Sequence, residues 1–187
     1  MRLPSYALGL VLAFVLQAGL LGWIVVDRAM LLKHGKEVRL AVIPVDPHDL
    51  FRGDYVVLNY DASLMKSDVV ANDGLFELGD TAYVSLGPNG KATRMAHARP
   101  ASGTFLKGAV SDATDVTSCE SVATSCRTYR VDYNLEKFFV PEGTGRALET
   151  LRSEQKISVD VAVANDGRAA LKRLLVDGQP RFEEPPY

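Results

Sequence analysis

Three residue types that mark many functional sites are scarce in this chain. Its 187 residues include two cysteines, three histidines and one tryptophan. Two cysteines with no histidine nearby fall short of the four ligands of a structural zinc site. A basic excess is also missing, since 21 Lys and Arg residues stand against 23 Asp and Glu residues. The chain therefore lacks the positive surface that nucleic-acid binding requires, and we expect no nucleic-acid partner.

Charge is absent from one long stretch near the N-terminus. Residues 6–26 contain no charged side chain, and Gln17 is their one strongly polar residue. A helix of this length spans about 30 Å, the thickness of the hydrocarbon core of a membrane. A cleaved signal peptide would have a shorter apolar core and a small-x-small cleavage site, and no convincing site of that kind follows. The stretch predicts an uncleaved anchor that contacts the lipid bilayer through residues 6–26.

Two features of the sequence predict opposite orientations for this anchor, and the first is the charge on either side of it. Arg2 alone precedes the apolar stretch, whereas Arg28, Lys33, Lys36 and Arg39 follow it. By the positive-inside rule these charges favour a cytoplasmic domain.

The two cysteines favour export instead. Cys119 and Cys126 flank a short polar loop, and a pair so close in sequence can close a hairpin-like disulfide. Such bonds persist in oxidising compartments. Two unrelated buried thiols are the alternative. We give the cysteines more weight and predict an exported domain.

Beyond the anchor, the apolar pattern changes to a period of two, which is typical of β-strands. Residues 27–34 continue the helix as a stalk, and Gly35 fits its C-cap. Residues 111–126 are predicted to form a polar loop. Strands are predicted over 37–43, 55–60, 81–86, 91–98, 104–110, 128–133, 156–163 and 169–176, and a short helix around 146–154.

These elements predict a mainly β fold. A membrane anchor and stalk (1–36) precede a single β-rich domain (37–177) with about eight or nine strands and one short helix, and a Pro-rich tail (178–187) follows. The sheet is expected to close into a barrel-like form or to fold on itself, because either arrangement protects its edges. The sequence does not choose between the two.

One stretch, Pro44 to Tyr60, concentrates charged, aromatic and turn-forming residues and reads PVDPHDLFRGDYVVLNY. Its end, GDYVVLNY, resembles the signature of the GDYXXLXY family of bacterial membrane-anchored proteins. The preceding run is similar to the family's PVDPRDLFR, with His48 in place of arginine, so one basic contact is missing or pH-sensitive. Residues 133–143, which end in Pro-Glu-Gly, resemble the family's second block. The resemblance covers most of residues 5–145.

This resemblance implies a single N-terminal anchor and an extracytoplasmic domain. It also implies a multi-pass membrane protein as a partner, since such proteins are often encoded beside members of the family. It implies no activity and no substrate, and we expect neither a cofactor nor a metal. The predicted location is the bacterial inner (cytoplasmic) membrane, with a single pass and the C-terminal domain facing the periplasm.

The Pro44–Tyr60 stretch partly matches a catalytic signature. Pro47, Leu50, Gly53 and Asp54 match the Ser-Met-x-Pro-x-Leu-x-x-Gly-Asp signature of signal peptidases with one extra residue. The nucleophilic serine would fall on a proline or a valine, neither of which can attack a carbonyl. We therefore predict no catalytic residue here.

Metal binding and a structural network are the other interpretations. Asp46, His48 and Asp49 could ligate a divalent ion, but Asp-Pro-x-Asp is more typical of a turn. Arg52 could instead form a buried or half-buried ionic network, because a guanidinium can take a bidentate carboxylate partner. The candidate residues for this network, or for a recognition surface at the same loop, are Asp46, His48, Asp49, Arg52, Asp54, Tyr55, Tyr60, Glu136 and Glu142.

Two classes of function remain open from the sequence. The first is an anchored accessory or binding module that acts with an integral membrane partner. The alternative is a degenerate signal-peptidase-like or otherwise unrecognised envelope hydrolase.

Overall fold

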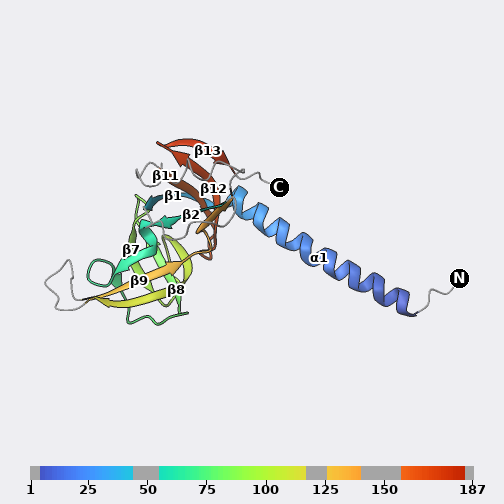
Figure 1. Ribbon diagram of the computed structural model, residues 1–187. Coiled ribbons are helices and arrows are strands. Elements are labelled where there is room, and N and C mark those ends of the chain that lie inside the picture. Colours follow the sequence, from blue (N-terminus) through green and yellow to red (C-terminus); the bar gives the residue numbers. More distant parts are fainter. Residues whose placement is uncertain (1–4, 44–54, 117–125, 140–156, 184–187) are drawn as a thin grey trace.

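The computed structural model describes residues 5–43, 55–116, 126–139 and 157–183, and Figure 1 shows two parts. A long helix, α1 (Ser5–His34), projects from a β-rich domain. By its length and composition, α1 could cross a membrane. Its apolar side chains lie outside the domain, and Leu12 and Trp23 are about 70% exposed. The anchor predicted for residues 6–26 is therefore part of one continuous helix that includes the predicted stalk.

A five-stranded antiparallel sheet begins one residue after the helix. Strand β1 (Lys36–Ile43) pairs with β11 (Ile157–Val163) on one side and with β3 (Asn59–Tyr60) on the other. The order continues through β12 (Ala169–Val176) to β13 (Gln179–Glu183). Strands β1 and β11 follow the alternation in the sequence.

Strand β13 lies in the segment predicted as a tail. A two-residue turn at Asp177 and Gly178, both with positive φ, returns the chain against β12. Residues 179–183 are thus part of the sheet, and Pro180 is tolerated because β13 is an edge strand.

A six-stranded sheet forms the second half of the domain. Its order is β4 (Leu64–Lys66), β9 (Cys126–Asp132), β8 (Thr104–Val116), β6 (Thr81–Leu86), β7 (Ala92–Ala96) and β5 (Ala71–Asn72). The polar loop predicted to start at residue 111 is wrong in its first part, because β8 continues to Val116 and pairs with β9. The composition is polar because both faces of this outer end are largely exposed.

Three short elements complete the described part of the domain. Strands β2 (Tyr55–Val57) and β10 (Lys137–Phe139) pair with each other, and a 3₁₀ turn, η1 (Asp61–Ser63), follows β3. The sheets curl into a half-barrel around one apolar core, which confirms the predicted mainly β class. The short helix predicted around 146–154 lies outside the described residues. Fully buried core side chains come from both sheets and include Leu40, Tyr60, Val84, Leu106, Val131, Val159 and Leu174.

Candidate functional site

The two sequence blocks that resemble the family signature are neighbours in the fold. Tyr55, Val56 and Val57 pair in antiparallel register with residues 137–139. The backbone N–H of Leu58 donates to the carbonyl of Glu136 at 2.8 Å. The single strand predicted over 55–60 is interrupted at Leu58, where pairing changes: β2 pairs with the second block and β3 with β1.

Tyr60 extends this contact through its side chain. The ring is fully buried, and its hydroxyl donates to the carbonyl of Leu135 at 2.5 Å. Burial raises the pKa of Tyr60 well above its usual value, and the nearby carboxylate of Glu136 raises it further. The hydroxyl therefore stays protonated at ordinary pH, when it acts as a hydrogen-bond donor.

Glu136 itself fixes the turn that precedes β10. Its Oε1 accepts from the backbone N–H of Tyr133 at 2.6 Å. The Tyr133 hydroxyl donates to the carbonyl of Ala62 at 2.5 Å, and burial raises the pKa of this hydroxyl as well. The described part of the motif is thus a set of buried tyrosine contacts that join η1, β3 and the second block.

Most of the predicted loop residues lie outside the described part of the chain. The ionic network around Arg52 and the recognition surface at the same loop remain predictions. Tyr55 is described through its backbone alone. Within the described ranges, no group of three His, Cys, Asp or Glu side chains is arranged to hold a metal ion. The residues outside the description are Asp46, His48, Asp49, Arg52, Asp54 and Glu142.

Cys126 begins β9, where it lies opposite Val116 of β8. Its side chain is buried and disulfide-bonded. The other cysteine of the sequence, Cys119, lies outside the described residues. The pairing of Cys119 with Cys126 remains a prediction.

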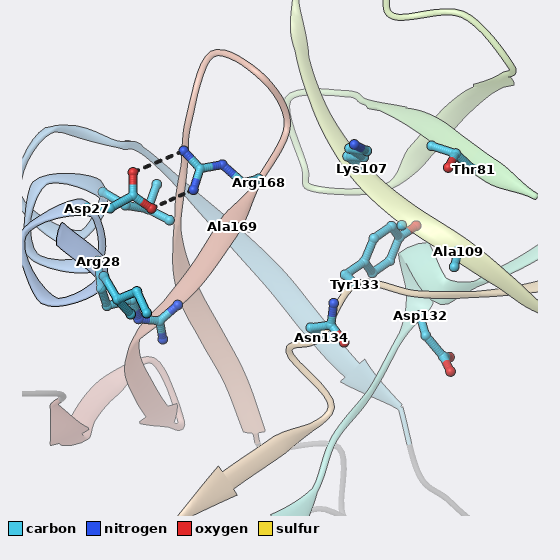
Figure 2. Close-up of a pocket in the computed structure, with 13 residues that line it drawn as sticks. Asp27, Arg28, Thr81, Lys107, Ala109, Asp132, Tyr133, Asn134, Arg168 and Ala169 are labelled. Atoms are coloured by element: carbon cyan, nitrogen blue, oxygen red, sulfur yellow. Dashed lines mark hydrogen bonds and ion pairs between the residues drawn. The ribbon is translucent and has the colours of Figure 1, made fainter. Parts of the chain in front are cut away.

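A second region of interest, the junction cleft, is the hollow between α1 and the outer face of the six-stranded sheet. Figure 2 shows Arg168, from the β11–β12 turn, facing Asp27 of the helix. The guanidinium donates to both carboxylate oxygens of Asp27, at 2.5 and 3.2 Å, and to Asp166 at 2.7 Å. These two carboxylates raise the pKa of Arg168 further above its usual value. The bidentate pair fixes the helix against the domain.

The cleft has a volume of about 510 Å³. Ile24, Asp27 and Arg28 line it from the helix, and Lys107 and Asp132 line it from the sheet (Figure 2). A cavity of this size suits a small ligand or a headgroup. Sequence reasoning did not find it, because its walls come from segments far apart in the chain.

Sequence reasoning also missed a cluster around His97. Its Nδ1 lies 3.0 Å from Asp73, and its Nε2 lies 3.9 Å from Asp80. The ring stacks on the buried Phe76, with centroids 3.8 Å apart. A parallel pairing of β5 with β7 places Asp73 beside His97, and no local sequence pattern announces that pairing.

The fold and the junction together define a mainly β domain carried on one apolar helix long enough to cross a membrane. The model of the family described as GDYXXLXY protein matches residues 17–174. The chain therefore belongs to the GDYXXLXY family. Neither the curated proteins nor the solved structures contain a match to it.

Proposed function

We propose that this chain is a single-pass inner-membrane protein whose β domain faces the periplasm and acts there as an accessory or binding module with an integral membrane partner. The observation that carries this proposal is the boundary along α1. Every side chain from residue 9 to residue 26 is exposed, and half-burial begins at Asp27, where the apolar run also ends. A bilayer would cover the bare apolar turns and stop where the domain starts.

Alkaline washing of membranes tests the anchor. We expect the full chain to stay in the membrane pellet. Leu12→Arg combined with Leu16→Arg should release it, because each arginine at the centre of a span costs about 2.5–3.5 kcal/mol on insertion scales. Leu12→Ile with Leu16→Ile is the matched control and should behave like the parent. Recovery of the parent chain in the wash would contradict the anchor.

The periplasmic orientation is supported by the disulfide at Cys126, since such bonds persist outside the reducing cytoplasm. Arg39, one of the positive charges that oppose it, has a structural partner in the domain. Arg39 donates to the buried Asp160 at 2.8 Å, and Arg173 reaches the same carboxylate at 3.3 Å. Lys33 lies in the last turn of α1, where the helix dipole favours a cation.

Protease added to cells with an opened outer membrane tests the orientation. The β domain should be digested while the inner membrane is still intact. Protection of the domain until the inner membrane is broken would place it in the cytoplasm.

Contact with a partner is supported by the loop between β5 and β6. Leu75 and Leu78 are 73% and 70% exposed, whereas Phe76 between them is fully buried. The N–H of Gly79 donates to the carbonyl of Val110 at 2.8 Å, which holds the loop on β8. Two large apolar side chains presented by a fixed loop are typical of an interaction surface.

Site-specific photocross-linking in native membranes tests the partner. A cross-linking side chain at position 75 should capture a multi-pass membrane protein, identified by mass spectrometry, and Leu78→Ser should reduce the yield. The same side chain at Val69, 59% exposed, serves as the control and should give background yield. Equal background at both positions would argue against this contact.

The alternative, an unrecognised envelope hydrolase, gains one observation. Asp73 and His97 are arranged like a general base and the carboxylate that orients it. Within the described residues, the ring contacts two carboxylates and Phe76 but no hydroxyl or thiol that could serve as nucleophile. The binding module is therefore the better-supported function.

A further inference from the structure

We infer that the junction cleft binds the headgroup of a zwitterionic phospholipid with a primary ammonium, such as phosphatidylethanolamine. This inference rests on the proposed membrane anchoring. The cleft opens beside Ile24, within the last turn of the apolar run, and extends past Asp27 and Arg28, the first charged residues after it. When the apolar run fills the hydrocarbon core, the cleft therefore lies at the level of the lipid phosphates.

The sheet wall of the cleft carries both charges of such a headgroup. Lys107 and Ala109 lie two residues apart on β8, so they share its outer face. Asp132 lies directly opposite Ala109 in the β8–β9 register and shares this face as well. Lys107 and Asp132 are thus diagonal neighbours, whose Cα atoms are about 7–8 Å apart in a sheet of this kind. At that spacing the cation can bind the phosphate of a headgroup while the carboxylate binds its ammonium. In an ethanolamine headgroup these two groups are attached to adjacent carbon atoms.

Other charges in the cleft do not compete for these groups. Arg168 is held by the carboxylates of Asp27 and Asp166. In the described part of the chain no ion pair or hydrogen bond involves the side chain of Lys107 or Asp132. The sheet wall thus offers Lys107 to the phosphate and Asp132 to the ammonium.

The headgroup chemistry follows from this pairing. An anionic lipid without an amine would leave Asp132 facing a negative group. A choline headgroup cannot donate a hydrogen bond to that carboxylate, because its nitrogen carries no hydrogen. A primary ammonium can donate to Asp132 while its phosphate accepts from Lys107.

Native mass spectrometry of lipids retained by the full chain tests this assignment. The chain is reconstituted in nanodiscs with equal parts of phosphatidylethanolamine and phosphatidylcholine and then released in mild detergent. The parent chain should retain phosphatidylethanolamine in preference to phosphatidylcholine. Lys107→Glu should reduce retention of both lipids at least about fivefold, because one basic residue near a phosphate surface contributes about 1 kcal/mol. Asp132→Asn should keep lipid retention and lose the preference for the amine.

Arg94→Glu is the matched control, since it reverses an exposed cation on β7, on the side of the domain away from α1 (Figure 1). It should retain lipids like the parent. Thermal melts check that each variant is folded, and Lys107→Gln replaces Lys107→Glu if the latter is not. A bulk lipid ratio for the parent, or unchanged retention in the Lys107 variant, would overturn the headgroup assignment.

Two further measurements separate the sources of failure. Release of the parent chain by the alkaline wash would refute the anchor, whereas a retained chain without lipid preference would refute the headgroup site alone. Soluble phosphoethanolamine is the second probe, added to the chain in detergent without lipid. Binding as tight as that of the phospholipid would make a soluble phosphoester the occupant and overturn the lipid assignment.

Discussion

At the scale of single residues, buried tyrosine hydroxyls hold the motif together. Tyr60 is fully buried and donates to the carbonyl of Leu135, a residue of the second block. Removing one partner of a buried hydrogen bond lowers the stability by more than the net contribution of that bond. The reason is that water cannot reach the polar atom that is left unpaired.

Tyr60→Phe should therefore destabilise the domain by about 1–3 kcal/mol without changing its fold. Urea denaturation followed by circular dichroism measures the change. Tyr83→Phe on β6 is the matched control, because the Tyr83 ring is half-buried and its hydroxyl has no partner in the described part of the chain. It should change stability by less than about 0.5 kcal/mol. Equal effects of the two substitutions would contradict the role of the Tyr60 hydroxyl.

The carboxylate of Asp73 makes part of the stability pH-dependent. Partial burial raises the pKa of Asp73, but hydrogen bonds from the ring and the backbone of His97 outweigh it, so the pKa lies below its usual range. A carboxyl group with a lowered folded-state pKa contributes stability above its unfolded pKa of about 3.9. That contribution is lost as the pH falls through the folded-state pKa.

We therefore expect the melting temperature of the parent to fall more steeply below about pH 4 than that of Asp73→Asn. Thermal melts across this range measure the difference. Glu183→Gln removes an exposed carboxylate at the end of β13 and should leave the pH profile unchanged. If the melting temperature of Asp73→Asn differed from that of the parent by the same amount at every pH, this prediction would be contradicted. The hydrogen bonds of Asp73 would then contribute to stability, but its titration would not.

At the scale of elements, the connection between α1 and β1 is short and closely packed. Gly35 is the one residue between them, and its N–H donates to the carbonyl of Leu31 at 2.8 Å. A methyl group added at Gly35 would lie 2.6 Å from that carbonyl oxygen and 2.9 Å from the Cβ of Ala162. Neither neighbour is the flexible end of a side chain.

Gly35→Ala should therefore destabilise the junction by about 1–3 kcal/mol, the usual cost of overpacking. Hydrogen exchange of β1 and β11 localises the effect, since both strands meet there. Gly22→Ala adds the same methyl group in the apolar helix, where nothing lies within 4 Å, and should leave the exchange unchanged. Unchanged protection of β1 in Gly35→Ala would show that the junction can relax.

Elements with strong local patterns could be predicted from the sequence, and those fixed by distant partners could not. The apolar run specified α1, and alternation specified β1, β9 and β11. Strand β13 was missed although Asp177-Gly178 is a hairpin signal, because the neighbouring prolines suggested a tail. The end of β8 was missed because its residues are polar, and pairing with β9 rather than burial makes it a strand.

The candidate site divides in the same way. The candidate network residues come from both motif blocks, and the structure pairs β2 of the first block with β10 of the second. The junction cleft could not be predicted, since Asp27 and Arg168 are 141 residues apart. Their meeting depends on the whole sheet order rather than on any local spacing.

At the scale of the whole molecule, redox state should control stability. If Cys126 pairs with Cys119 as predicted, the bond closes a short loop and contributes about 2–3 kcal/mol in the chain-entropy model. Reductant should therefore lower the melting temperature of the parent and leave a Cys119→Ser/Cys126→Ser variant unaffected. Mass analysis after alkylation without reductant should find no free thiol, and two labelled cysteines would contradict the pairing.

The single-residue connection at Gly35 also couples the orientation of the β domain to that of the helix. A helix of 30 residues is about 45 Å long, and its last turn is bonded to the first strand of the sheet. The bond between Arg168 and Asp27 adds a second attachment along the same helix. Because no flexible linker separates α1 from the β domain, a change in the tilt of the helix rotates the domain through the same angle. In the proposed membrane-spanning arrangement, the exposed leucines at positions 75 and 78 would move away from or toward the membrane as the bilayer thickens or thins.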